Sequence, residues 1–194
     1  MRTVSRDPLF GEIVVDLDRD GGVVRVEGES VPPGVLHRTG VDGLRTDVLR
    51  TDVPIGTRES SRLRLAVDGQ QHDLRVGPGR IARRSYRIRT DGPGGVRLFA
   101  PASADAHRLI RGERYTGHDE IGRFVLEESS TDSSSVVVVD WSEEIRVAGA
   151  VARAAAPTPM DSTIGHLLAA SFGTGARLMV VAVVSGLVDS VFPN

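Results

Sequence analysis

Hydrophobic and polar residues alternate one by one in short runs along most of this chain. The run RLRLAV at residues 62–67 places Leu63, Leu65 and Val67 on one side, with arginine or alanine between them. This period of two residues predicts a strand that is buried on one face. Similar runs recur from Glu12 to Ala154, separated by turn residues, and predict roughly ten to twelve strands, as in a barrel or a sandwich.

Two Asp-Gly pairs predict where neighbouring strands turn back. The sequence RDGG at residues 19–22 separates EIVVDLD from VVRVEGE, and Asp68-Gly69 separates RLRLAV from HDLRV. Asp-Gly supplies the positive φ angles that tight hairpin turns require. We therefore expect antiparallel hairpins at both positions.

The pattern changes at the Pro-Thr-Pro sequence of residues 157–159. Two prolines cannot extend a central strand, so we expect a linker here. Asp161 or Ser162 is the expected N-cap of a following helix, whose apolar residues recur at helical spacing up to Phe172.

The last part of the chain contains its most hydrophobic stretch. Gly173 and Gly175 break or kink the helical segment before Leu178–Val188, which carries no charged residue. These eleven residues are fewer than the about 20 that cross a bilayer as a helix. They are apolar on all sides, whereas a surface helix has a polar face. We favour a segment enclosed by a closed sheet, and an interface helix, a helix on an open sheet and a membrane anchor stay open as alternatives.

The predicted architecture is mainly β with a C-terminal helix. We expect a closed barrel or sandwich of roughly twelve strands over residues 1–156. Residues 157–194 supply the linker and the apolar helical segment, packed in or on the barrel as part of the same domain.

The order of these elements resembles that of a known family. Short strands from Glu12 to Ala154, a last strand near Val136–Trp141 and an apolar helix over Ile164–Phe192 are similar to the tubby-like family, which includes the LURP-one-related proteins and the phospholipid scramblases. The resemblance implies a twelve-stranded barrel around a hydrophobic helix. It also implies binding to phosphoinositides or membrane surfaces, and it carries over no catalytic residues.

Composition limits the partners and the compartment. The net charge of −2 and an aromatic content of 4% argue against nucleic acid binding. The absence of cysteine excludes disulfides and thiol chemistry. The first ten residues lack the apolar stretch of a secretory signal, so we expect a cytoplasmic protein, with association at the membrane surface left open. All 24 basic residues are arginine, which suggests a bacterium with a GC-rich genome.

A cluster of arginines is the first candidate site. Guanidinium groups and the exposed amides of the Gly-Pro-Gly turn at residues 77–79 suit a phosphate or another anion. The alternative is charge balance within the protein, because an acidic stretch follows at residues 127–144. The candidate ligand residues are Arg75, Arg80, Arg83, Arg84, Arg87 and Arg89.

A calcium-loop pattern is the second candidate site. Asp16, Asp18, Asp20 and Glu27 match the spacing D-x-D-x-D-G-x5-E, which places carboxylates around one hard cation. The flanking β-branched residues predict strands, whereas the EF-hand has helices there. We therefore favour a hairpin with exposed acidic residues and keep calcium as the alternative.

No catalytic motif stands out, and nucleotide-binding glycine motifs are absent from the sequence. We therefore expect a non-enzymatic binding protein for a phospholipid, another anionic headgroup or a protein partner. The alternative is an assembly subunit whose apolar C-terminal helix docks into a partner or into a second copy of the chain.

Overall fold

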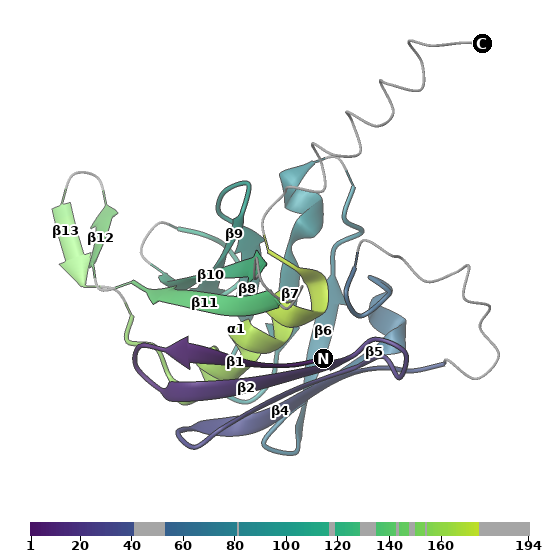
Figure 1. The fold of residues 1–194 in the computed structure, drawn as a ribbon. Helices are drawn as coiled ribbons and strands as arrows, with labels where there is room; N and C mark the ends of the chain where they lie inside the picture. The colour runs from purple at the N-terminus through teal and green to yellow at the C-terminus, as the bar shows by residue number, and fades with distance from the viewer. Residues whose placement is uncertain are drawn as a thin grey trace, which may run out of the picture.

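The computed structural model describes residues 1–40, 53–80, 82–116, 119–128, 135–142, 144–147, 150–153 and 155–174. Eleven strands of one antiparallel sheet curl into a nearly closed barrel, and a helix runs through its interior (Figure 1). The predicted mainly β barrel with a C-terminal helix is confirmed. The strands are β1 (Arg2–Asp7), β2 (Gly11–Asp18), β3 (Val23–Gly28), β4 (Val31–Arg38), β5 (Leu63–Val67), β6 (Gln70–Val76), β7 (Ile88–Asp91), β8 (Arg97–Pro101), β9 (Ala106–Arg111), β10 (Glu120–Glu128) and β11 (Ser135–Trp141).

Both predicted hairpins form, although in the first one the positive φ angle is at Gly22 (62°) and not at the Asp20-Gly21 pair. β2 pairs with β3 around residues 19–22, and β5 pairs with β6 around Asp68-Gly69. Asp68 and Gly69 both adopt positive φ angles, 52° and 70°. This is the conformation that a tight hairpin turn imposes on its two central residues.

The barrel closes between its first and last strands without a ladder of backbone hydrogen bonds. Successive strands reverse direction, so in a sheet of eleven strands β1 and β11 run parallel where they lie side by side. Side chains bridge this seam. Ser5 Oγ donates a hydrogen bond to the carbonyl of Val137, and Trp141 Nε1 donates to Asp7 Oδ1 at 2.8 Å.

Helix α1 (Pro159–Phe172) forms the centre of the hydrophobic core. Every residue from Asp161 to Phe172 is buried, so the helix is covered on all sides. Two glycines allow this close packing, because a Cβ on Gly34 would lie 2.5 Å from Thr163 Cγ2 and one on Gly165 would overlap the ring of Phe124.

The predicted N-cap was wrong by a few residues. Thr158 caps the helix, and Asp161 occupies the N3 position of a capping box. Pro159 is the reason, because proline fits the first helical position, where its missing N–H has no partner to lose. The predicted break after Phe172 is confirmed by Gly173, which ends the helix with a φ of 74°.

Ion pairs fix the N-terminal end of α1 in the barrel. Arg97 Nε and Arg111 Nη2 donate to the two oxygens of Asp161, at 2.5 and 2.7 Å. Burial by itself would raise the pKa of Asp161, but the charge and hydrogen bond of Arg97 outweigh it and lower that pKa. The carboxylate is therefore held in its charged form.

A loop closes the other end of the barrel. The backbone N–H of Ile55 donates to the carbonyl of Ser171 at 3.0 Å and so satisfies one of the last carbonyls of α1. Arg38 is buried beside this loop and donates to the carbonyl of Ile55 at 2.6 Å. Both ends of the helix are thus held by polar contacts.

Two parts of the C-terminal prediction did not join the barrel as expected: one forms a separate hairpin, and the other lies outside the described residues. The strands expected after Trp141 form a separate hairpin of β12 (Glu144–Val147) and β13 (Ala150–Arg153). The apolar stretch Leu178–Val188 lies outside the described residues, and the helix inside the barrel is the preceding one, α1.

Candidate ligand-binding site

Three of the six predicted arginines meet around one hollow on the outside of the barrel. Arg83 and Arg84 belong to the short 3₁₀ helix η3 (Arg83–Tyr86), and Arg87 follows it. With Arg108 of β9 they line a hollow that has an empty volume of about 530 Å³ and is open to solvent. We call this hollow the arginine pocket. Its lining residues are Arg83, Arg84, Arg87, Leu98, Ala100, Pro101, Arg108, Ile110 and Tyr115.

The other three arginines do not line the pocket. Arg75 and Arg89 lie opposite each other on β6 and β7. Arg89 pairs with Asp91 at 2.9 Å and with Glu113 at 3.0 Å. For Arg89, therefore, charge balance within the protein is the better interpretation, although its partner carboxylates differ from the predicted ones.

Backbone hydrogen bonds within the loop before β7 position η3. Gly77 N donates to the carbonyl of Arg87, and Gly79 N donates to the carbonyl of Ser85, each at 2.8 Å. The buried guanidinium of Arg58 donates to the carbonyls of Gly77 and Tyr86 at 2.8 and 3.3 Å. The loop is therefore anchored to the barrel beneath it, while Arg83 and Arg84 stay exposed.

The floor of the arginine pocket is apolar because of strand alternation. On β8, Arg97 and Phe99 face the barrel interior, and the intervening Leu98 and Ala100 face outward. Leu98, Ala100 and Ile110 form a small hydrophobic cluster separate from the main core. They form the base of the hollow but are already buried, at 6%, 7% and 0% exposed, so little of their surface is left for a ligand to cover.

The arginines of the pocket differ in how they are neutralised. Arg108 Nη1 lies 3.0 Å from Glu120 Oε2, and the guanidinium stands 4.5 Å from the centre of the Tyr115 ring. Within the described part of the chain, no carboxylate pairs with Arg83, Arg84 or Arg87. Three positive charges therefore lie beside an apolar floor without a counter-charge among these residues.

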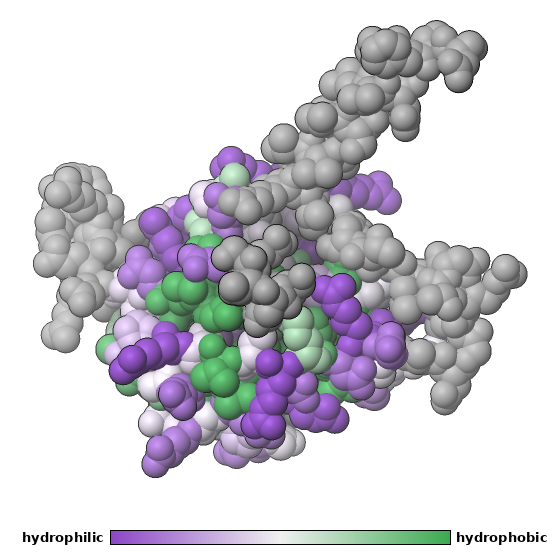
Figure 2. All heavy atoms as spheres, in the orientation of Figure 1, coloured by the Kyte–Doolittle hydropathy of each residue, from purple (hydrophilic) through white to green (hydrophobic). Residues whose placement is uncertain are grey.

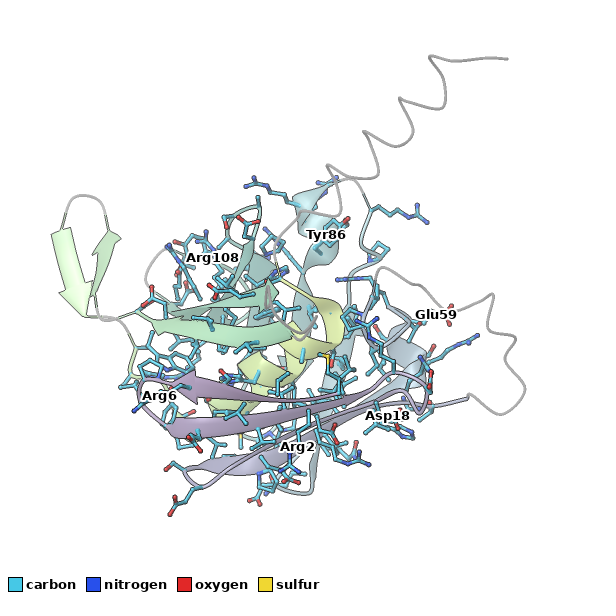
Figure 3. The ribbon with its side chains drawn as sticks, viewed as in Figure 1. Arg2, Arg6, Asp18, Glu59, Tyr86 and Arg108 are labelled. Carbon is cyan, nitrogen blue, oxygen red and sulfur yellow. The ribbon has the colours of Figure 1, made fainter. Side chains whose placement is uncertain are left out.

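Figure 3 shows on which side of the barrel the pocket lies. Tyr86, the last residue of η3, and Arg108 lie together on one side, whereas Arg2 and Arg6 lie on the opposite side, along β1 (Figure 3). Sequence reasoning missed Arg108 and Tyr115. The only sequence signal for them is the outward-facing position of Arg108 on its strand, which does not reveal that η3 lies next to it.

The predicted calcium residues are spread along the β2–β3 hairpin. Asp16 lies opposite Arg25, and Glu27 lies opposite Val14, two residues before Asp16 on β2. Asp18 Oδ1 accepts a hydrogen bond from Gly21 N at 2.9 Å and so shapes the turn. Among the residues that the structure describes, no group of three or more His, Asp or Glu side chains could hold a metal ion. The hairpin interpretation agrees with this arrangement, and the geometry gives calcium no support.

A buried polar network lies where β1, β11 and α1 meet, and no pattern in the sequence indicated it. Ser162 Oγ donates to Asp7 Oδ2 at 2.6 Å, and His166 lies 3.3 Å from the hydroxyls of both Ser162 and Ser5. Burial lowers the pKa of His166, so the imidazole is neutral near pH 7. Ser5 donates its own proton to the Val137 carbonyl. The network therefore fastens the seam of the barrel to the helix.

A second, apolar hollow opens along the same seam. It has an empty volume of about 360 Å³, and its lining includes Val15, Leu126, Val137 and Ala170. Figure 2 shows hydrophobic residues at the surface in this region, between hydrophilic ones. The hollow is lined by one arginine, Arg19, and lacks the concentration of charge found at the arginine pocket.

Comparison with known proteins adds no relative. No protein-family model matches the chain, and no curated protein or solved structure matches it. The resemblance to the tubby-like family therefore stays a prediction. None of the helices in the described ranges has the length and hydrophobicity that a membrane span requires.

Proposed function

We propose that this protein binds an anionic ligand, a phosphate-bearing headgroup, at the arginine pocket. The observation that carries the proposal is the set of three guanidiniums, from Arg83, Arg84 and Arg87, that have no carboxylate partner among the described residues and surround one hollow. Guanidinium groups bind phosphate oxygens through paired, charge-assisted hydrogen bonds. An unpaired cluster of like charges costs free energy unless an anion binds to it.

We further propose that binding occurs without chemical conversion. The described side chains that line the pocket comprise four arginines, one tyrosine and four apolar residues. General acid–base and nucleophilic catalysis most often use histidine, carboxylate, serine or cysteine side chains, and the lining supplies none of these. The predicted role as a non-enzymatic binding protein is therefore kept.

Flotation with lipid vesicles tests the proposal. The intact chain is mixed with vesicles of phosphatidylcholine alone or with one fifth of an anionic phospholipid, and the bound fraction is measured. Each basic residue near an anionic surface contributes about 1 kcal/mol, so Arg83→Glu together with Arg84→Glu should weaken binding by at least about 30-fold, because two attractive charges are lost and two repulsive ones are added.

The control is Arg2→Glu together with Arg6→Glu, which changes the net charge equally on the opposite side of the barrel (Figure 3). This variant should float like the wild type. An equal loss of vesicle binding in both double variants would mean that net charge alone drives association. Equal binding by Arg83→Glu/Arg84→Glu and by the wild type would reject the arginine pocket as the site.

A further inference from the structure

The seam of the barrel has an outer face that carries exposed valines. Along β1, Ser5 faces the interior, and the preceding Val4 faces outward and is 54% exposed. On β11, Val138 also faces outward and is 40% exposed. The hydrogen bond from Ser5 to the carbonyl of Val137 places the two valines close to each other on either side of the seam. Unlike the floor of the arginine pocket, they leave apolar surface that a partner can cover.

Strand pairing extends this surface to four neighbouring strands. Val4 lies opposite Val14 on β2, and Val138 lies opposite Val125 on β10. Both of these partners are half-buried and lie on the same outer face. The four valines therefore form a row across β2, β1, β11 and β10. We call the outer surface of these four strands the seam face.

A row of alternating charges lies beside the valine row. Arg6 of β1 lies opposite Glu12 of β2, and Asp140 of β11 lies opposite Arg123 of β10. The last side chains of β1 and β11 are hydrogen-bonded to each other, so the two pairs lie at the same end of the seam face. Across β2, β1, β11 and β10 the charges are therefore negative, positive, negative and positive. An apolar centre beside a charged rim is typical of a protein–protein interface.

Two copies of this charged row are complementary when one of them is reversed. A two-fold axis along the seam places β1 of one copy against β11 of the other, and β2 against β10. Arg6 then faces Asp140 of the second copy, and Glu12 faces Arg123 of the second copy. Arg123 already pairs with Glu120, whereas Arg6 and Asp140 have no ion-pair partner among the described residues. The contact between Arg6 and Asp140 is therefore the one that decides the arrangement.

The other two-fold arrangement is disfavoured by the same charges. An axis across the strands places each strand against itself, so that Arg6 faces Arg2 on β1 and Glu12 faces Asp16 on β2. Opposite charges then meet on β10 alone. With the axis along the seam, the one like-charge contact is between Asp16 and Glu127, at the rim, where water and salt screen it.

We infer that the seam face is the interface of a two-fold symmetric dimer of this chain. The valine rows of the two copies pack against each other and supply the affinity, and the charged rows set the orientation. Four strands about 4.8 Å apart form a surface roughly 20 Å wide, which is small for a specific interface, so we expect a Kd in the micromolar range.

This inference does not depend on the proposed function. The arginine pocket lies on the side of the barrel opposite to β1, so the two pockets of a dimer face away from each other (Figure 3). One vesicle surface can therefore contact only one of them. Vesicle binding at the arginine pocket should stay the same whether or not the dimer forms, and either proposal can fail alone.

Sedimentation equilibrium of the intact chain between about 1 μM and about 1 mM tests the inference. The wild type should change from monomer to dimer across this range. Arg6→Asp places a like charge against Asp140 of the second copy, and Asp140→Arg does the same against Arg6. Each contact occurs twice in a symmetric dimer, so each substitution should weaken dimerisation roughly tenfold.

A mixture of the two variants identifies the strands that touch. When Arg6→Asp meets Asp140→Arg, both contacts across the two-fold axis again join opposite charges. An equimolar mixture should therefore form dimers about as tightly as the wild type, although neither variant does so alone. Arg64→Asp, at an exposed position on β5, is the matched control and should dimerise like the wild type.

Val4→Ser tests the apolar contact. It should also weaken dimerisation roughly tenfold, because one valine is lost from each copy. Leu9→Ser is its control, because Leu9 is 58% exposed on the turn between β1 and β2, outside the seam face.

A wild type that stays monomeric up to about 1 mM would overturn the inference and leave the seam face to a different partner chain. So would dimers that Arg6→Asp, Asp140→Arg and Val4→Ser all leave unchanged, because another surface would then be the interface. If the two charge variants are weakened and their mixture is no tighter than either one, β1 does not face β11 of the second copy, and the inference fails as well.

Discussion

Two groups of arginines in this protein lie in opposite environments. Arg97, at the N-terminal end of α1, is 3% exposed and pairs with Asp161, which is 0% exposed. Arg83 and Arg84 are exposed on η3, and no carboxylate pairs with them among the described residues. The buried pair has its hydrogen bonds satisfied within the fold, so it holds the helix in place. The exposed pair has no such partner among the described residues, so it contributes little to stability, and under the proposed function its charge is available to a ligand.

Removal of the buried carboxylate should have the largest effect on stability. Asp161→Ala leaves the guanidinium of Arg97 buried without its partner and also removes the capping box with Thr158. Loss of one partner of a buried ion pair costs about 3–5 kcal/mol of unfolding free energy. Urea denaturation measures this change.

Asp73→Ala is the matched control for that substitution, because Asp73 is exposed on β6. It should alter the unfolding free energy by no more than about 0.5 kcal/mol. If Asp161→Ala had the same unfolding free energy as this control, the buried ion pair would not stabilise the fold, and the two groups of arginines would not differ in stability.

Lowering the pH should lower the unfolding free energy, because buried histidines become protonated on unfolding, but it should leave the charge of the arginine pocket unchanged. Burial lowers the pKa of His107 to about 3, with a further contribution from Arg58, from an ordinary value of 6.5. The unfolded chain therefore binds a proton that the folded chain does not. This stabilisation is complete above pH 6.5 and is lost as the pH falls, by about 2 kcal/mol at pH 5. Burial also lowers the pKa of His166 and of His72, and both add to the effect in the same direction.

The pH dependence is measured as the unfolding free energy at pH 8, 6.5 and 5. His107→Gln should remove about 2 kcal/mol of the change, because glutamine does not titrate. His37→Gln, at an exposed position on β4, should keep it. A wild-type protein equally stable at pH 8 and pH 5 would contradict the prediction. Arginine does not titrate in this range, so the positive charge of the arginine pocket should stay constant over the same pH series.

Glu120 connects the two environments, because it is buried and yet binds an arginine of the pocket. It is 4% exposed and accepts hydrogen bonds from Arg108 at 3.0 Å and from Arg123 at 2.7 Å. Glu120→Gln should lower the unfolding free energy by roughly 1–2 kcal/mol, because two charge-assisted hydrogen bonds are weakened. The same change leaves Arg108 without the counter-charge of Glu120, so binding to vesicles that contain the anionic phospholipid should tighten about twofold to fivefold.

Urea denaturation measures the predicted loss of stability in Glu120→Gln, and vesicle flotation measures the predicted gain in binding. Glu127→Gln, at an exposed position on the same strand, is the control and should change neither quantity. Lower stability together with unchanged affinity would show that Arg108 takes no part in binding.

Local patterns predicted the barrel, and contacts between distant segments determined the site. Alternation along RLRLAV at residues 62–67 and the Asp68-Gly69 turn depend on neighbours in sequence, so both could be predicted. The seam network could not, because residues 5, 7, 162 and 166 meet only after the barrel has closed. The capping error had a local cause. Thr158 and Asp161 match the capping-box spacing, and Pro159 between them marks the first helical position.

One part of the arginine pocket could be predicted, because it too depends on residues that are neighbours in sequence. Arg83, Arg84 and Arg87 are neighbours in sequence, and the Gly-Pro-Gly turn before them is a local signal. Arg108 and the apolar floor come from β8 and β9, and they join the site only because the sheet places these strands beside η3. Pairing with carboxylates decides which arginines stay unpaired among the described residues, and pairing depends on the tertiary fold.

The smallest effect on stability is expected where the effect on binding is largest. Arg83→Glu together with Arg84→Glu removes no hydrogen bond that holds the fold, because the loop is held by its backbone and by Arg58. The unfolding free energy should therefore change by no more than about 0.5 kcal/mol. Reversing two of three like charges should make any change slightly stabilising. A loss of several kcal/mol would mean that the two arginines have structural partners, and the distinction between paired and unpaired arginines would then fail at the arginine pocket.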